Sequence, residues 1–111
     1  MIPTRFGRYG IAFVSPPQGN VKNRFRLDLM KTVNAKDKSP IDKDCICYVC
    51  QNFSRAYVHH LFRSQELLAY RLASYHNVYF LVNLTKQIRQ AILDDRFEEL
   101  KEEWLVVSSS E

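Results

Sequence analysis

The feature that most constrains this chain is a short run that contains all three of its cysteines. Cys45, Cys47 and Cys50 lie within six residues, in the spacing C-x-C-x-x-C. An odd number of clustered thiols is poorly explained by disulfides in a reducing compartment. A structural zinc ion readily takes several thiolates. The spacing therefore predicts a zinc site that staples an irregular turn to the rest of the fold.

A structural zinc site needs a fourth ligand, and the chain has no fourth cysteine. His59 and His60 follow the cysteines too closely to fold back onto the turn. His76 is separated from Cys50 by 25 residues, so one helix leading away and a second returning would bring it beside the cysteines. The three cysteines and His76 are therefore predicted to bind one zinc ion. The alternative is a set of small buried thiols beside a core histidine; a nucleophilic cysteine is disfavoured because a metal-bound thiolate is a poor nucleophile.

Backbone-breaking residues divide the chain into halves of different structure. All three glycines and all four prolines precede residue 41. The run IAFVS (11–15), the turn PPQGN (16–20) and the run VKNRFRL (21–27) predict a short two-stranded ribbon. An irregular polar connection is expected over 31–43.

The second half has the apolar spacing of helices. Phe53, Tyr57 and His60 form an aromatic stripe on one face of the first helix. The chain is thus expected to be mostly α, with a short β ribbon and a zinc-stapled turn. Three helices are expected, the first of about three turns from Gln51. The second should run from Gln65 to about Asp94, with Ser64 as its N-cap. The third should run from Phe97 to about Val106 and be opened by a capping pair of Asp95 and Glu98.

Positive charge is concentrated in the first part of the chain. Residues 1–44 hold nine Lys and Arg against four Asp and Glu, whereas residues 45–111 hold seven against eight. This asymmetry fits a segment that faces nucleic acid, with solubility alone as the alternative. Neither a membrane span nor a secretory signal is recognisable, so a cytoplasmic protein without membrane contact is expected.

Four stretches occur together and in order: PTRFGRYG, PIDKDCICYVC, SRAYVHHLFR, and the pair His76 and Asn77. With them the chain, from about Ile2 to about Trp104, resembles the C-terminal part of a bacterial tRNA-guanine transglycosylase, also called queuine tRNA-ribosyltransferase. The resemblance implies an α/β fold, an irregular TIM-type barrel with a zinc subdomain near its C-terminal end. Residues 1–44 would be the end of a barrel strand, a loop and the basic ribbon; residues 45–111 would be the zinc-binding subdomain and the C-terminal helices.

The family likeness implies a transferase that exchanges guanine for a deazaguanine base at the tRNA wobble position, in queuosine synthesis. In that family an aspartate nucleophile precedes the PTR motif, where this chain has only Met1 and Ile2. We therefore expect no catalytic residue here and no exchange activity from the chain alone. The aspartates that residues 1–44 do contain are expected to be solvated loop residues or turn formers: Asp28, Asp37, Asp42 and Asp44.

The likeness also implies contacts with tRNA. Thr4, Arg5 and Arg8 match the motif that follows the catalytic strand, near where the family receives the anticodon region. Arg5 is the best candidate for a phosphate contact, because a guanidinium binds phosphate through a bidentate fork; the alternative is an arginine that braces a glycine-containing loop. The basic residues of the ribbon are weaker candidates: Lys22, Arg24 and Arg26.

The resemblance also implies that the chain contacts other protein chains. The family is commonly a homodimer, and the likeness places Phe53, Tyr57 and His60 at its interface, with intrachain core as the alternative role. The missing N-terminal part of the enzyme would be another partner. A second function class stays open, a stand-alone, non-catalytic zinc-stapled module that binds tRNA or a partner chain.

Overall fold

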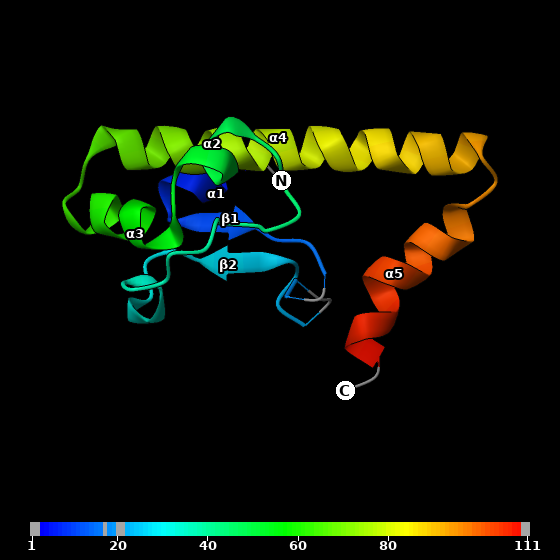
Figure 1. The fold of residues 1–111 in the computed structure, drawn as a ribbon, viewed down its shortest axis with the longest axis horizontal. Helices are drawn as coiled ribbons and strands as arrows, with labels where there is room; N and C mark the ends of the chain where they lie inside the picture. The colour runs from blue at the N-terminus through cyan, green and yellow to red at the C-terminus, as the bar shows by residue number, and fades with distance from the viewer. Residues whose placement is uncertain (1–2, 17, 20–21, 110–111) are drawn as a thin grey trace.

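A single long helix organises the chain. In a computed structural model, residues 3–16, 18–19 and 22–109 are described, with the side chains of residues 5–105 in these ranges. Helix α4 spans the molecule, the sheet and helices α1 to α3 lie along its N-terminal half, and α5 descends at an angle from its far end (Figure 1). The bounds are α1 Pro3–Arg8, β1 Ile11–Phe13, β2 Arg26–Asp28, η1 Thr32–Asn34, α2 Tyr48–Asn52, α3 Arg55–Arg63, α4 Leu67–Leu93 and α5 Phe97–Ser109.

The predicted two-stranded ribbon is confirmed, but it is shorter than expected. Strands β1 and β2 pair antiparallel, with Ala12 opposite Leu27. The chain enters β1 through Gly10, whose φ of +77° is a conformation that glycine adopts without strain. Before β2, Arg24 and Phe25 also have positive φ values of 55° and 59°, so the chain turns there, although the Val14 N–H still bonds to the Phe25 carbonyl at 2.9 Å.

The first predicted helix is wrong as a continuous element. It breaks at Phe53, which is extended (φ −131°, ψ 145°), into the short α2 and the separate α3. The side-chain oxygen of Ser54 accepts the Tyr57 backbone N–H and caps the start of α3. Ser64 closes α3 and does not open α4, because its N–H bonds to the carbonyl of His60.

Helices α4 and α5 were predicted to within two or three residues at the ends, with one exception at their junction. Asp95 has a φ of 56°, so it is a left-handed residue that ends α4 and not the N-cap of α5. The N–H of Asp95 bonds to the Ile92 carbonyl, and the N–H of Arg96 bonds to the Ala91 carbonyl. This is the Schellman pattern that commonly closes helices.

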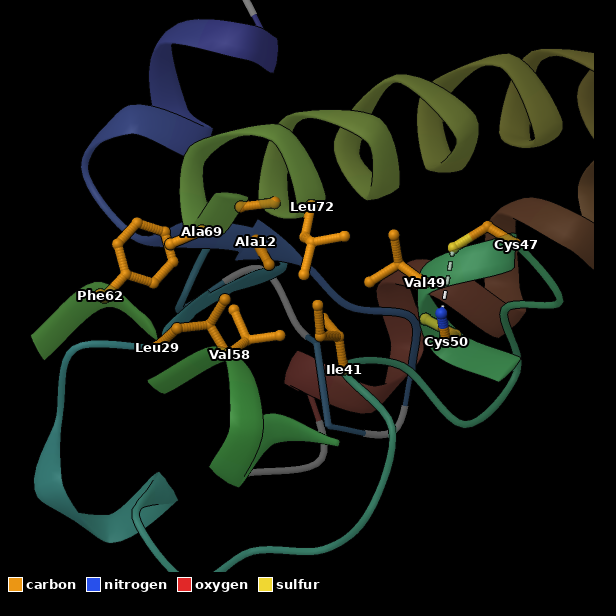
Figure 2. Packing of buried hydrophobic residues seen from close by; sticks show 11 residues of the cluster. Ala12, Leu29, Ile41, Cys47, Val49, Cys50, Val58, Phe62, Ala69 and Leu72 are labelled. Atoms are coloured by element: carbon orange, nitrogen blue, oxygen red, sulfur yellow. Dashed lines mark hydrogen bonds between the residues drawn. The ribbon is translucent and has the colours of Figure 1, made fainter. Parts of the chain in front are cut away.

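The core lies between the sheet, α3 and the first half of α4 (Figure 2). Leu29, Ile41 and Val58 are completely buried there. Helix α1 packs directly on α4, where a Cβ built on Gly7 would lie 2.5 Å from Ser74 Oγ. The absence of a side chain at Gly7 therefore permits the close approach of the two helices.

The second half of α4 packs against α5 at its C-terminal end, whereas Phe80, near the middle of α4, lies against Phe13 of β1. Leu84 and Ile88 are half-buried beside an apolar cavity of about 330 Å³ that Trp104 of α5 also lines. Ile92, near the end of α4, is 60% exposed. No helix among the described residues is long and apolar enough to span a membrane.

Candidate metal centre

Helix α2 begins at the cysteine cluster and orients its sulfur atoms. Cys47 is the N-cap, and its Sγ accepts the backbone N–H of Cys50 at 3.4 Å (Figure 2). Cys45 Sγ accepts the N–H of Cys47 at 3.5 Å. Backbone N–H groups directed at sulfur favour the thiolate form, which is the form that binds metal.

His76 comes from the middle of α4 and completes the cluster. Its Nδ1 lies 3.7 Å from Cys45 Sγ, 3.6 Å from Cys47 Sγ and 3.3 Å from Cys50 Sγ. The four donor atoms all lie within 4.8 Å of one another. The four residues that the sequence predicts as ligands thus converge on one point.

The spacing of these donors can be compared with that around a tetrahedral zinc ion. Zn–S distances of about 2.3 Å and Zn–N distances of about 2.0–2.1 Å give sulfur-to-nitrogen separations of about 3.6 Å in a regular tetrahedron. The three observed separations, 3.3 to 3.7 Å, bracket that value. The group can therefore hold a metal ion with little rearrangement of its side chains.

The outer face of the His76 ring is fixed by strand β1. Nε2 lies 2.7 Å from the carbonyl oxygen of Phe13, so this nitrogen carries the proton and donates to the carbonyl. In the neutral ring, which is the form that binds metal, Nδ1 then presents its lone pair towards the three sulfurs. A second hydrogen bond of this kind is the usual way in which a protein orients a histidine ligand.

Asn77, the next residue, binds the same strand. Its Oδ1 accepts the N–H of Phe13 at 3.0 Å, and its Nδ2 donates to the carbonyl of Ile11 at 2.9 Å. His76 and Asn77 therefore satisfy the edge of β1 that faces away from β2. The metal centre is joined in this way to β1 and, through it, to α1.

The crowded donors shift one another's acidity. Hydrogen bonds from the neighbouring thiols of Cys45 and Cys50 lower the pKa of Cys47, whereas the same crowding raises the pKa of Cys50. Burial disfavours the charged ring of His76, but hydrogen bonds to Cys45 and Cys47 outweigh burial and raise its pKa to about 9. Without metal the cluster therefore holds a thiolate surrounded by proton donors, which a cation would replace.

The loop before Cys45 is held by a buried carboxylate. Asp42 is only 4% exposed, so the expectation of a solvated residue is wrong for it. It accepts the N–H of Ser15 at 3.1 Å and the Ser15 hydroxyl at 2.8 Å. It also accepts the N–H of Asp44 at 3.2 Å, which bears out its role as a turn former.

Arg55 supports the same loop and was not singled out from the sequence. Its guanidinium donates to the carbonyls of Pro40 at 3.0 Å and Ile41 at 2.8 Å, and lies 3.6 Å from an Asp37 carboxylate oxygen. It is 7% exposed. No spacing rule identifies it, because its partners lie at least 14 residues away.

The residues expected to contact tRNA lie on α1, which contributes no member of this cluster. Arg5 and Arg8 are exposed on α1, one turn from each other. Thr4 is in the same helix, and its side chain lies outside the described residues.

The aromatic stripe expected at an interface is only partly exposed. Phe53 is half-buried and stacks on Tyr57, with ring centroids 5.3 Å apart and planes at 17°. Tyr57 is 44% exposed. His60 is exposed, and its Nε2 lies 3.2 Å from the carbonyl of Ala35. Its neighbour His59 is buried, with Nδ1 2.8 Å from the Leu29 carbonyl.

Comparison with known proteins gives a consistent match. The family model described as queuine tRNA-ribosyltransferase matches residues 1–110. A queuine tRNA-ribosyltransferase of Nostoc sp. is 51% identical over 106 residues, which cover 95% of this chain and 26% of the relative. The enzyme of that name from a Cyanothece sp. is 49% identical over 110 residues, which cover 98% of this chain and 26% of the relative. The one from a Roseiflexus sp. is 48% identical over 103 residues, which cover 93% of this chain and 25% of the relative. The chain thus spans about a quarter of the length of the curated relatives it matches.

Proposed function

The chain belongs to the queuine tRNA-ribosyltransferase family, and on that basis we propose that it is the C-terminal, zinc-binding part of such an enzyme. The proposed activity of the whole enzyme is the exchange of guanine for a deazaguanine base at the wobble position of tRNA, in queuosine synthesis. The observation that carries the proposal is the family match over residues 1–110, which includes all four members of the Cys₃His cluster. In this proposal, residues 1–44 complete a TIM-type barrel and residues 45–111 form the zinc subdomain with the C-terminal helices.

The proposed ion is one zinc, bound by Cys45, Cys47, Cys50 and His76. Three thiolates and one imidazole are a soft, four-membered donor set, which suits zinc and leaves no position open for a substrate. The role we propose is therefore structural. The ion would join the turn before α2 to the middle of α4, and the Nε2 hydrogen bond of His76 would extend that link to β1.

The proposed tRNA contacts are Thr4, Arg5 and Arg8 on α1. Both arginines are exposed, and no acidic residue lies in the first turn of this helix. Their guanidinium groups can each bind a phosphate through two parallel hydrogen bonds. Binding of this kind neutralises phosphates and should weaken steeply as salt rises.

The exchange reaction itself is proposed for the whole enzyme and not for this chain alone. The test is incorporation of labelled guanine into tRNA by the chain, and by the chain mixed with the N-terminal three quarters of the Nostoc relative. We expect turnover only in the mixture, and a Cys47→Ser variant should reduce it. Turnover by the isolated, monomeric chain would contradict the proposal.

A second candidate function is a non-catalytic module that binds tRNA or a partner chain. It is favoured by the fully buried core residues Leu29, Ile41 and Val58, which show that a core closes within these 111 residues. A homodimer through Phe53, Tyr57 and His60, which the family likeness implies, is a separate proposal; the exposed ring of Tyr57 is available to a second copy. Light scattering after size exclusion tests it: a dimer should dissociate in Tyr57→Arg, and an unchanged dimer would exclude this surface.

A further inference from the structure

Arg26 on β2 is held by an aromatic ring. Its guanidinium carbon lies 4.5 Å from the centre of the Phe6 ring on α1. The Phe6 ring in turn meets Phe13 edge-on, with centroids 5.7 Å apart and planes at 85°. The guanidinium therefore rests on an aromatic platform to which both α1 and β1 contribute.

The charge of this group is not fully compensated within the described part of the chain. Nε of Arg26 is buried and has no hydrogen-bond acceptor there. Arginine stays protonated at any physiological pH, so a buried, unpaired guanidinium nitrogen is unfavourable unless an anion lies close by. Asp28, two positions along the strand, has one carboxylate oxygen engaged by the N–H of Met30.

The position of Arg26 on the surface indicates what kind of anion would bind. Arg26 as a whole is half-buried, so it lies at the edge of the core and is not enclosed by it. The helix that carries Phe6 also carries the exposed Arg5 and Arg8. A polyanion with regularly spaced phosphates can engage several such groups at once, whereas a single free phosphate cannot.

We propose that Arg26 is an additional phosphate-binding residue, which contacts the backbone of the RNA that α1 binds. The terminal nitrogens of the stacked guanidinium would form two parallel hydrogen bonds to one phosphate. The inference rests on the proposed tRNA-binding function and extends the contact surface from α1 onto β2.

The test is binding of an unmodified tRNA transcript to the 111-residue chain, followed by fluorescence anisotropy between about 50 and 200 mM salt. Arg26→Gln should weaken binding several-fold at low salt and reduce the slope of log K against log salt by about one, because one phosphate contact is lost. Arg26→Lys keeps the charge and should retain most of the slope, yet bind about three- to tenfold more weakly without the bidentate fork. Phe6→Leu removes the platform and should resemble Arg26→Lys.

Arg89→Gln is the matched control, because Arg89 is exposed on the second half of α4 and the change in charge is identical. It should leave affinity within about twofold of the wild-type chain. Equal effects of Arg26→Gln and Arg89→Gln, with normal wild-type binding, would overturn this inference alone. Failure of the wild-type chain to bind tRNA would overturn the proposed function as well.

Two further measurements decide the remaining outcomes. Circular dichroism and metal content verify that the variants are folded. If Arg26→Gln is not folded, the affinity of Arg26→Lys for tRNA is the test. An affinity of Arg26→Lys equal to that of the wild-type chain would then overturn the proposal. Inorganic phosphate, added at constant ionic strength, should not displace the RNA. Displacement that occurs in the wild-type chain but not in Arg26→Gln would identify free phosphate as the ligand and reject RNA.

Discussion

Replacing Asn77 by alanine should weaken the link between β1 and α4 without removing a metal ligand. The wild-type side chain binds both the N–H of Phe13 and the carbonyl of Ile11. Asn77 itself is fully buried. In Asn77→Ala these two backbone groups lose their partner, and water has little access to replace it.

The size of the effect follows from the two lost hydrogen bonds. Leaving one buried backbone group unsatisfied costs about 1–3 kcal/mol, so the loss of two partners should lower the free energy of unfolding by about 2–6 kcal/mol. At about 4–8 °C per kcal/mol for a domain of nearly this size, the melting temperature should drop by at least about 8 °C. Asn34→Ala is the matched control, because Asn34 is 2% exposed and its Nδ2 donates to a single carbonyl, that of Asp28. The control should lose about half as much stability.

The assay is urea unfolding of the reduced, metal-loaded chain, followed by circular dichroism, with metal content measured on the same samples. We expect Asn77→Ala to keep its metal and to unfold at clearly lower urea than Asn34→Ala. If the two variants lose the same stability, the link between β1 and α4 is not what the hydrogen bonds indicate, and the reasoning is refuted.

Three further predictions concern packing, pH and the loop before the cysteines. Gly7→Val should destabilise the chain by about 1–3 kcal/mol in thermal unfolding, because the first added carbon would already lie 2.5 Å from Ser74 Oγ; an unchanged melting temperature would contradict the packing of α1. In the metal-free chain, the raised pKa of His76 stabilises the folded state. This stabilisation is complete below pH 6.5, the pKa of the ring in the unfolded chain, and is lost as pH rises through about 9. The urea midpoint should therefore fall across that range. With metal, occupancy should instead rise with pH as protons leave the donors, and a titration with one sign in both states would count against this. Arg55→Met should lower stability by about 2–4 kcal/mol in urea unfolding, since two buried carbonyls, one of them that of Ile41, lose a charged donor; a loss below about 1 kcal/mol would reject that role.

The parts of the structure that were predictable are those fixed by local spacing and donor chemistry. The long α4 was visible in its three- and four-residue apolar period, and the convergence of His76 with the cysteines follows from a helix that leads away and one that returns. The break at Phe53 was missed because the aromatic period continues across it, although Ser54 was an available capping residue. Helix ends at residues such as Gln65 and Asp95 were misread, because left-handed closing positions are usually marked by glycine and these are not.

What could not be predicted depends on contacts between distant segments. The burial of Asp42 requires Ser15 to lie beside it, and the clamp of Arg55 requires the carbonyls of residues 40 and 41 to face α3. A charged residue in a polar stretch is ordinarily exposed, so composition favoured solvent for both. The hydrogen bond from His76 to Phe13 spans 63 residues and has no local sequence pattern.

The measurement that tests the central claim most directly is the metal content of the chain purified under reducing conditions. Elemental analysis should find about one zinc per chain, and replacement by cobalt should give the absorption of a tetrahedral site with thiolate ligands. Cys47→Ser and His76→Ala should each lower the metal content and the helical circular dichroism, because the ion links α2 to α4. A chain that contains no metal and keeps its full helical signal would contradict the account of these four residues as a structural zinc site.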